Sequence, residues 1–126
     1  MEELLYTEQL EANFTITEDR IFCEHGKLEF SFENNATIVN SISVYLKRNR
    51  IGTNLVNQLE ILAIQNGLNI IEVPASPTKE AILFWQFLDY KPSSKDDIFW
   101  ANKIVRSHKE SSWDTPQGIV VMRKEI

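Results

Sequence analysis

The chain has 126 residues, a size that fits one domain over residues 1–126 and leaves little room for a second hydrophobic core. Its 43% hydrophobic and 25% charged residues are typical of a globular protein, and no run approaches the roughly 18 apolar residues of a membrane-spanning helix. The formal net charge of −5, without a long basic run or aromatic interleaving, argues against nucleic acid as a partner.

The N-terminal segment is acidic where a secretory signal would be basic, so we expect a cytoplasmic protein that does not bind membranes. Residues 1–10 predict at most one helical turn, and partial alternation over residues 10–16 predicts a short strand.

Residues 20–45 have the pattern of an antiparallel meander. Residues 20–24 and 27–33 predict two strands around a tight turn at residues 25–26, because apolar and polar residues alternate strictly in the second run. Residues 34–35, both asparagine, predict another turn, and the β-branched residues over 36–45 predict a third strand.

A helix and another strand follow the meander. Apolar residues after Gly52 recur at the spacing of an amphipathic helix: Leu55, Val56, Leu59, Leu62 and Ala63. Residues 66–67, Asn-Gly, end that helix, and residues 68–73 predict a mostly apolar strand covered on both faces, which Pro74 and Pro77 break. The order strand, helix, strand predicts a parallel crossover and an α/β fold.

The C-terminal third predicts a second helix and a closing strand pair. Thr78 is a plausible N-cap for a helix over residues 79–88, whose aromatic and aliphatic side chains we expect to fill the core. The apolar runs at residues 97–101 and 118–124 predict two strands. The lone cysteine, Cys23, predicts a buried thiol without chemistry, and no metal-ligand spacing is visible.

The most informative segment is the basic loop at residues 47–50, directly before the first long helix. The first N–H groups of a helix lack partners and lie at the positive end of the helix dipole, which makes them a site for pyrophosphate. Gly52 lacks the Cβ that would block a close approach. The same pattern also fits an ordinary solvated turn, so the loop needs support from the rest of the chain.

That loop resembles the acetyl-CoA loop of the GNAT acetyltransferases, whose pattern is Arg/Gln-x-x-Gly-x-Gly/Ala followed by a helix. Lys47 stands at the Arg/Gln position, Arg50 replaces the first glycine, and Gly52 matches the last. Residues 81–90 resemble the Ala-x-x-Phe-Tyr-x-x-x-Gly-Phe helix and turn of the same family, with Trp85 at the tyrosine position.

The C-terminus adds a third match in the same order along the chain. Residues 121–126 resemble the final strand of the family, which often reads apolar-Met-x-Lys. The resemblance covers roughly residues 20–126 and is weakest over residues 91–117. It implies a GNAT-like α/β (α+β) fold with a mixed central sheet, an antiparallel N-terminal meander, one parallel strand-helix-strand crossover, and helices on both faces.

The resemblance also implies acetyl-CoA as co-substrate, lying where two parallel strands diverge at the ends of residues 38–45 and 68–73. Position in the family pattern implies backbone contacts to the pantetheine from two β-strand residues, pyrophosphate contacts from the loop, and side-chain contacts from the second helix. The implied cofactor-binding residues are Ile42, Val44, Lys47, Arg48, Asn49, Arg50, Ile51, Gly52, Thr53, Thr78 and Trp85.

The implied reaction is direct attack of a neutral primary amine on a thioester, which needs a base for the ammonium proton and an acid for the departing thiolate. Trp85 replaces the tyrosine that usually serves as the acid, and an indole N–H does not give up a proton near neutral pH. Ser76 and Thr78 are candidate donors in its place, and Glu72 is the candidate base. Carboxylates and a histidine on the hairpin are further candidates for the base, although they fit solvated strand residues better: Glu24, His25, Glu29 and Glu33.

Three functions stay open at this point. The first is an N-acetyltransferase acting on an amine of a protein or small molecule. The second is a degenerate GNAT-like module that binds acyl-CoA or a protein without turnover, and the third is an α/β domain without a cofactor. The short segment before Arg20 leaves no room for the helix pair that shapes the acceptor pocket in the family, so we expect an exposed acceptor or a homodimer in which the partner chain completes the pocket.

Overall fold

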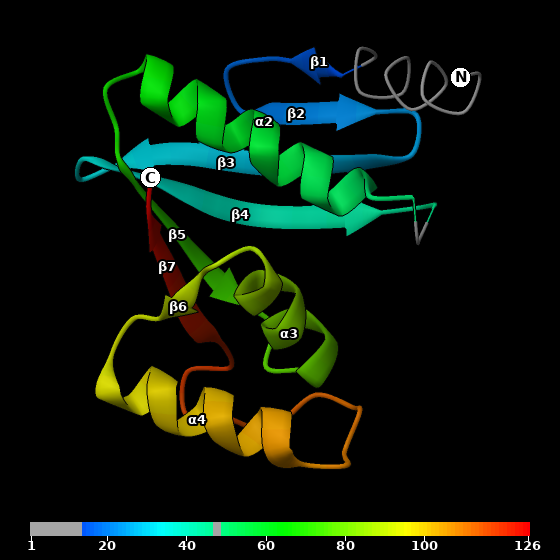
Figure 1. Ribbon diagram of the computed structural model, residues 1–126, viewed down its shortest axis with the longest axis vertical. Helices are drawn as coiled ribbons and strands as arrows, with labels where there is room; N and C mark the ends of the chain where they lie inside the picture. Colours follow the sequence, from blue (N-terminus) through cyan, green and yellow to red (C-terminus); the bar gives the residue numbers. More distant parts are fainter. Residues whose placement is uncertain (1–13, 47–48) are drawn as a thin grey trace. The chain divides into compact units, whose positions relative to one another are not determined.

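The computed structural model describes residues 14–46 and 49–126. The chain forms two compact units, Met1–Leu68 and Asn69–Ile126. Each unit contains its own strands and at least one helix (Figure 1).

Several predictions from the sequence fall outside the described residues. These are the helical turn over residues 1–10, residues 10–13 of the first strand, and the two site residues Lys47 and Arg48.

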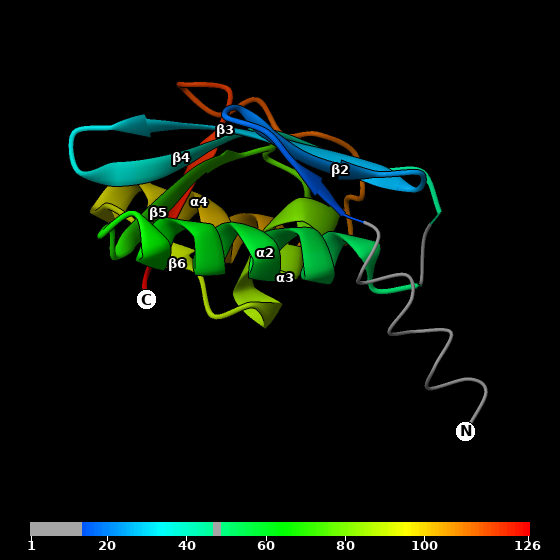
Figure 2. The same cartoon turned by 90° about the horizontal axis from the view of Figure 1, so that it is seen from above.

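The first unit is an antiparallel meander with one described helix. Its strands run in chain order, and each pairs with the next: β1 (Thr15–Ile16), β2 (Arg20–Cys23), β3 (Gly26–Glu33) and β4 (Ala36–Val44). Helix α2 (Ile51–Gln65) lies along one face of β2, β3 and β4 (Figures 1 and 2). The predicted hairpin and third strand are therefore confirmed.

The turns of the meander follow from their residues. Asn34 and Asn35 have φ angles of 50° and 64°, the left-handed pair that a two-residue type I′ connection requires and that asparagine tolerates. The turn between β2 and β3 lies one residue earlier than predicted, because Cys23 pairs with Gly26 and leaves Glu24 and His25 at the corner. Gly26 instead begins β3, where its lack of a side chain has a role described below.

Strand β4 contains one irregularity. Glu29 pairs with Ser41 while Phe30 pairs with Val39, so Asn40 is an extra residue in β4. Such a β-bulge bends the strand and changes the direction of its backbone groups. The bulge lies just before the last residues of β4.

Helix α2 confirms the periodicity seen in the sequence. Its buried residues form one face: Ile51, Gly52, Leu55, Val56, Leu59 and Ala63. At its C-terminus Leu68 N–H donates to the Ala63 carbonyl at 2.9 Å, and Gly67 N–H donates to that of Ile64 at 2.9 Å. This is a Schellman motif, and Gly67 supplies the required left-handed residue with φ 74°.

The second unit contains three strands and two helices among its residues: β5 (Ile70–Ala75), α3 (Lys79–Phe87), β6 (Lys91–Pro92), α4 (Lys95–Arg106) and β7 (Val120–Glu125). Strand β7 pairs antiparallel with β5 and with β6. The predicted last strand is thereby confirmed.

Strand β5 corrects two expectations. It continues through Pro74 to Ala75 instead of breaking. Ile126 N–H donates to the Asn69 carbonyl at 2.8 Å, so Asn69 and Ile126 form a hydrogen-bonded pair. Hydrogen-bonded and non-hydrogen-bonded pairs alternate along the ladder of β5 and β7, and this makes Pro74 and Val121 a non-hydrogen-bonded pair. Proline therefore loses no bond to β7. The strand is also not covered on both faces, because alternate residues of β5 are buried while Pro74 on the other face is exposed.

The predicted strand at residues 97–101 is wrong, since these residues lie in helix α4. The Ser94 hydroxyl accepts a hydrogen bond from Asp97 N–H at 3.2 Å and donates to the Asp97 carboxylate at 2.7 Å. Acidic residues in the first turn and Lys103 and Arg106 in the last turn complement the helix dipole. The serine cap and the charges outweigh the β-propensity of the Ile-Phe-Trp run.

Helix α3 confirms the predicted cap, because Ala81 N–H donates to the Thr78 hydroxyl at 3.2 Å. Trp85 and Tyr90 are buried, with their rings edge to face at 4.9 Å. Phe87, expected in the core, is 78% exposed instead. Asp89, at the glycine position of the family pattern, has φ 70° and so keeps the left-handed turn.

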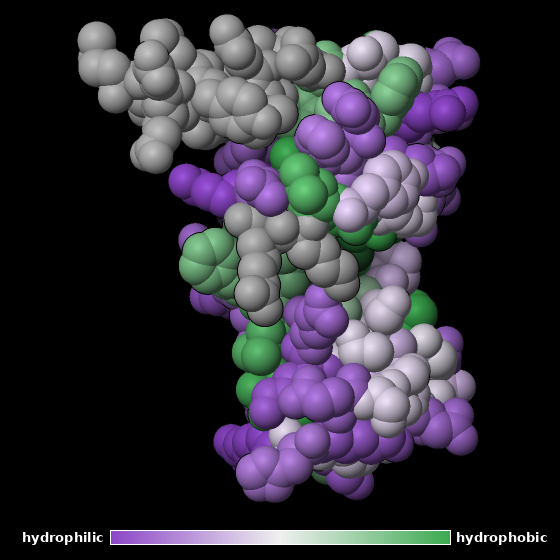
Figure 3. All heavy atoms as spheres, turned by 90° about the vertical axis from the view of Figure 1, so that its right-hand side faces the viewer, coloured by the Kyte–Doolittle hydropathy of each residue, from purple (hydrophilic) through white to green (hydrophobic). Residues whose placement is uncertain are grey.

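Several large apolar side chains of the described residues are exposed, among them Tyr45 and Phe87. Apolar residues, shown in green in Figure 3, form small separate areas on the face displayed there. Within residues 14–46 and 49–126, no helix combines the length and the apolar character needed to cross a bilayer.

Asp97→Ala should lower the free energy of unfolding by about 1–3 kcal/mol, because the Asp97 carboxylate accepts from Val121 N–H at 3.0 Å and so connects α4 to β7. Asp96→Ala is the matched control, since Asp96 is an exposed neighbour in the same turn. Urea denaturation of the two variants measures the difference. Equal losses would contradict a connecting role for Asp97.

Asp89→Gly and Asp89→Ala should have opposite effects on thermal stability. Glycine adopts φ 70° without steric cost, whereas alanine at a positive φ is strained by about 1 kcal/mol. The glycine variant should therefore melt at a higher temperature than the alanine variant. Equal melting temperatures would show that the left-handed residue does not determine this turn.

Candidate functional site

The start of α2 leaves backbone N–H groups without intrahelical acceptors. The first hydrogen bond of the helix runs from Asn54 N–H to the Arg50 carbonyl at 2.9 Å. The N–H groups of Ile51, Gly52 and Thr53 precede it and have no acceptor within the helix. The helix dipole places partial positive charge at this end.

Arg50 is the N-cap and has an unusual backbone conformation. Its φ and ψ are 60° and 18°, in the left-handed region, and its side chain makes no capping hydrogen bond. The sequence resemblance placed Arg50 where the family pattern has its first glycine, and the left-handed geometry is the one that glycine adopts without strain, so the arginine keeps this backbone at a steric cost. Its side chain is exposed, and no acidic residue lies in the first turn of α2.

Gly26 fixes where α2 begins. A Cβ on Gly26 would lie 2.9 Å from the Ser43 carbonyl oxygen and 3.0 Å from the Ile51 side chain. The first residue of α2 therefore packs directly against the backbone of β3. Because Gly26 also pairs with Val44, the end of β4 and the start of α2 lie close together in the first unit.

The end of β4 directs backbone groups away from the meander. The His25 carbonyl accepts from Tyr45 N–H at 2.7 Å, next to the pair formed by Gly26 and Val44. Hydrogen-bonded and non-hydrogen-bonded pairs alternate along an antiparallel ladder, so the N–H and C=O groups of Val44 and Ile42 point away from β3. These are the two residues whose backbone the resemblance assigned to the pantetheine.

The structure thus brings together the predicted residues of the first unit at one corner: Ile42, Val44, Asn49, Arg50, Ile51, Gly52 and Thr53. Ile51 and Gly52 are buried, so they contribute backbone groups and not side chains. Lys47 and Arg48 lie outside the described residues. Among the described residues, no group of His, Cys, Asp and Glu side chains could hold a metal ion.

The remaining predicted residues belong to the second unit. Ser76 is exposed, and its carbonyl accepts from Thr78 N–H at 2.8 Å. Glu72 is half-buried and lies opposite Arg123 in the ladder of β5 and β7. Trp85 is 2% exposed and contacts the Phe84 ring at 5.0 Å, which favours packing over ligand contact for its indole.

Sequence reasoning missed the role of Gly26. It treated this glycine as a turn residue, whereas the structure uses it for close packing of the helix against the strand. The signal was present in the pattern, since Gly26 begins a strictly alternating run at a position that faces the core.

Solved structures similar to this chain include several N-acetyltransferases and an anti-CRISPR protein. The chain is similar to the anti-CRISPR protein AcrVA5, with a TM-score of 0.59 and 20% identity over 82% of this chain and 94% of that one. It is also similar to PaiA N-acetyltransferase from Thermoplasma acidophilum in complex with coenzyme A, with a TM-score of 0.57 and 14% identity over 99% and 70% of the two chains.

A third similar structure is a putative N-acetyltransferase from Lactobacillus plantarum, with a TM-score of 0.60 and 13% identity. The alignment covers 84% of this chain and 66% of that protein, so the chain spans just under two thirds of that neighbour. No protein-family model and no curated protein sequence matches the chain. The chain therefore has the GNAT α/β fold, and the fold class expected from the sequence is confirmed.

Gly26→Ala should displace the first turn of α2, because the added Cβ meets a backbone oxygen at 2.9 Å. We expect a loss of about 1–3 kcal/mol in unfolding free energy together with weaker binding of coenzyme A. Gly67→Ala is the control, because it introduces strain at φ 74° at the other end of α2. It should lower stability and leave coenzyme A affinity unchanged. Equal effects of both variants on affinity would contradict a specific role for Gly26.

Proposed function

We propose that the chain is an acetyl-CoA-dependent N-acetyltransferase that transfers an acetyl group to a primary amine. The observation that carries the proposal is the first turn of α2, where three backbone N–H groups lie beside the exposed Arg50 side chain. A helix start without an acidic residue or a side-chain cap favours an anion. The pyrophosphate of coenzyme A is an anion of the required kind.

The outward backbone of Ile42 and Val44 supports the same proposal. An extended arm with amide groups, such as pantetheine, pairs with a strand edge as another strand would. The bulge at Asn40 changes the direction of the backbone just before these residues. An N–H group there can hydrogen-bond a thioester oxygen as negative charge develops on it.

When bound, acetyl-CoA supplies the thioester that donates the acetyl group. Similar structures that contain coenzyme A or acetyl coenzyme A include the T. acidophilum enzyme, an acetyltransferase from Bacillus subtilis and a putative streptothricin acetyltransferase from Bacillus anthracis. The residues proposed to hold it here are Arg50 by charge, with Ile51, Gly52 and Thr53 by backbone N–H groups. Lys47 and Arg48 would add positive charge.

Proton transfer is assigned to residues of the second unit. Glu72 is the proposed base for the ammonium proton of the acceptor. Trp85 stands where the family pattern has a tyrosine, and its buried indole cannot act as an acid. The thiolate is then protonated by water or by a hydroxyl donor, for which Ser76 and Thr78 are the candidates. The Thr78 oxygen accepts from Ala81 N–H, and its own proton stays available for donation.

A second candidate function is a module that binds acyl-CoA without turnover. The observation that favours it is Trp85, which removes the usual acid and is packed between Phe84 and Tyr90. The two functions share the site at α2 and differ only in the release of coenzyme A.

Arg50→Glu should weaken binding of coenzyme A and acetyl-CoA by about tenfold or more in calorimetry, because it reverses a charge beside the pyrophosphate. Arg50→Gly removes the charge but keeps the left-handed backbone, so it should weaken binding less. Lys95→Glu makes the same change of net charge on an exposed residue at the start of α4. If Lys95→Glu lowers the affinity for coenzyme A as much as Arg50→Glu does, the effect is due to net charge, and the proposed site at the start of α2 is rejected.

Glu72→Gln should lower kcat by about tenfold to a hundredfold and leave coenzyme A affinity unchanged, since it removes a general base and no cofactor contact. The assay measures release of coenzyme A from acetyl-CoA with spermidine or a lysine-containing peptide as acceptor. Glu125→Gln, an exposed change on β7, is the control. Tight binding of acetyl-CoA with no release for any amine would instead support the module without turnover.

A further inference from the structure

The second unit has an open cleft along α4 that the proposed reaction does not use. Its volume is about 640 Å³, and it is lined by residues of α4 and of the segment that follows: Phe99, Asn102, Lys103, Arg106, Ser107 and Trp113. The ionisable residues in this lining, Lys103 and Arg106, are both cations. The chain as a whole has a net charge of −5.

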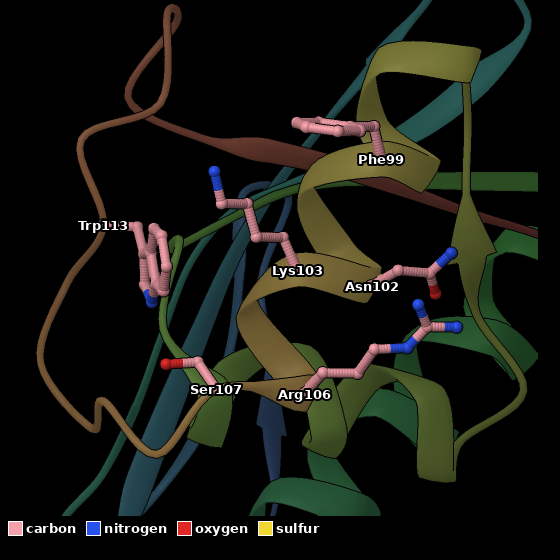
Figure 4. Close-up of a pocket in the computed structure, with 6 residues that line it drawn as sticks. All are labelled: Phe99, Asn102, Lys103, Arg106, Ser107 and Trp113. Atoms are coloured by element: carbon pink, nitrogen blue, oxygen red, sulfur yellow. The ribbon is translucent and has the colours of Figure 1, made fainter.

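Three aromatic rings surround one of these cations. The Lys103 ammonium lies 5.7 Å from the Phe99 ring centre, 5.3 Å from that of Trp100 and 5.7 Å from that of Trp113. Figure 4 shows Lys103 between Phe99 and Trp113, while the Asn102 and Arg106 side chains point away from Trp113. Lys109 adds a second cation, 4.9 Å from the Trp113 ring centre.

The segment from Ser107 to Trp113, which forms one side of the cleft, is hydrogen-bonded to the rest of the second unit. The backbone N–H of Trp113 donates to the Pro77 carbonyl at 2.9 Å. The Lys79 ammonium donates to the Ser107 carbonyl at 3.1 Å. Both ends of the segment from Ser107 to Trp113 are therefore tied to residues at the start of α3.

The indole nitrogen of Trp113 is buried and has no hydrogen-bond acceptor among the described residues. Figure 4 shows this nitrogen on the Ser107 side of the ring. A buried donor without an acceptor is costly, and an oxygen of a bound anion would satisfy it. This donor adds to the cations as a feature that fits a negatively charged ligand.

We propose that this cleft binds a nucleotide, either free or as part of a single nucleic acid strand. A base can stack on the Phe99 or Trp113 ring when the Lys103 ammonium, which lies over both rings, turns toward the phosphate. Lys103, Lys109 and Arg106 suit the phosphate. A peptide of aspartate and glutamate would use the cations but would offer no aromatic ring to stack on Phe99 or Trp113.

This inference runs against the expectation from sequence that nucleic acid is not a partner. That expectation rested on net charge and on the apparent absence of interleaved aromatic and basic residues. Helix α4 supplies the interleaving, since Phe99, Lys103 and Arg106 lie one turn apart on one face. The strand predicted over residues 97–101 contains Phe99 but ends before Lys103 and Arg106, so the sequence does not place these three residues together.

The test is calorimetry of the full chain with adenosine monophosphate and with a short oligodeoxyadenylate. Binding of the monophosphate would identify a free nucleotide, and binding of the oligonucleotide alone would identify a strand. Lys103→Glu should weaken the binding by about tenfold or more. Trp113→Phe keeps a ring and removes the indole donor, so it should weaken binding less than Trp113→Leu.

Two controls separate this site from the proposed coenzyme A site. Lys95→Glu, on the same helix but outside the cleft, and Arg50→Glu should both leave nucleotide binding unchanged. Coenzyme A contains an adenosine nucleotide and can enter both sites, so its binding at α2 is followed by the shift of the Ile51 N–H resonance, which Lys103→Glu should leave unchanged. The proposal is overturned if neither probe binds, if Lys103→Glu has no effect, or if inorganic phosphate or polyglutamate binds as tightly as the nucleotides.

Discussion

The left-handed residue at the start of α2 is the constraint on which the proposed site depends. Arg50 turns the chain from β4 into the helix with φ 60°, and the helix begins directly at Ile51. Because the turn uses backbone conformation and not a side-chain cap, the first N–H groups are left for a ligand. Gly26 holds this turn against β3, so the position of these groups is set by the core of the first unit.

Two departures from the family pattern have the same structural explanation. Arg50 and Asp89 both stand at glycine positions, and both adopt positive φ, at 60° and 70°. The chain therefore accepts a backbone cost of roughly 1–2 kcal/mol at each position and keeps the turn. At Arg50 the change also adds a positive charge beside the helix start, which makes the substitution compatible with an anionic ligand.

The sequence predicted the parts of the fold that local chemistry decides. The hairpin of β2 and β3, the Asn34–Asn35 turn and the glycine end of α2 follow from alternation and turn residues. Helix α4 was missed because Ile98, Phe99 and Trp100 favour strands, while the cap at Ser94 determines the outcome. Strand β5 continues through Pro74 because this residue lies at a non-hydrogen-bonded pair with β7. The register that decides this cannot be found from the sequence.

The candidate site was predictable only in part for a related reason. The basic loop, Gly52 and the strand before it could be located from sequence, but which backbone groups of β4 face outward depends on the ladder with β3.

The most direct test of the proposed anion site at the start of α2 is an NMR titration that follows the backbone N–H resonances of Ile51, Gly52 and Thr53. Coenzyme A should shift these resonances, and pantetheine, which lacks the pyrophosphate, should not. Unchanged resonances at saturating coenzyme A would contradict the account.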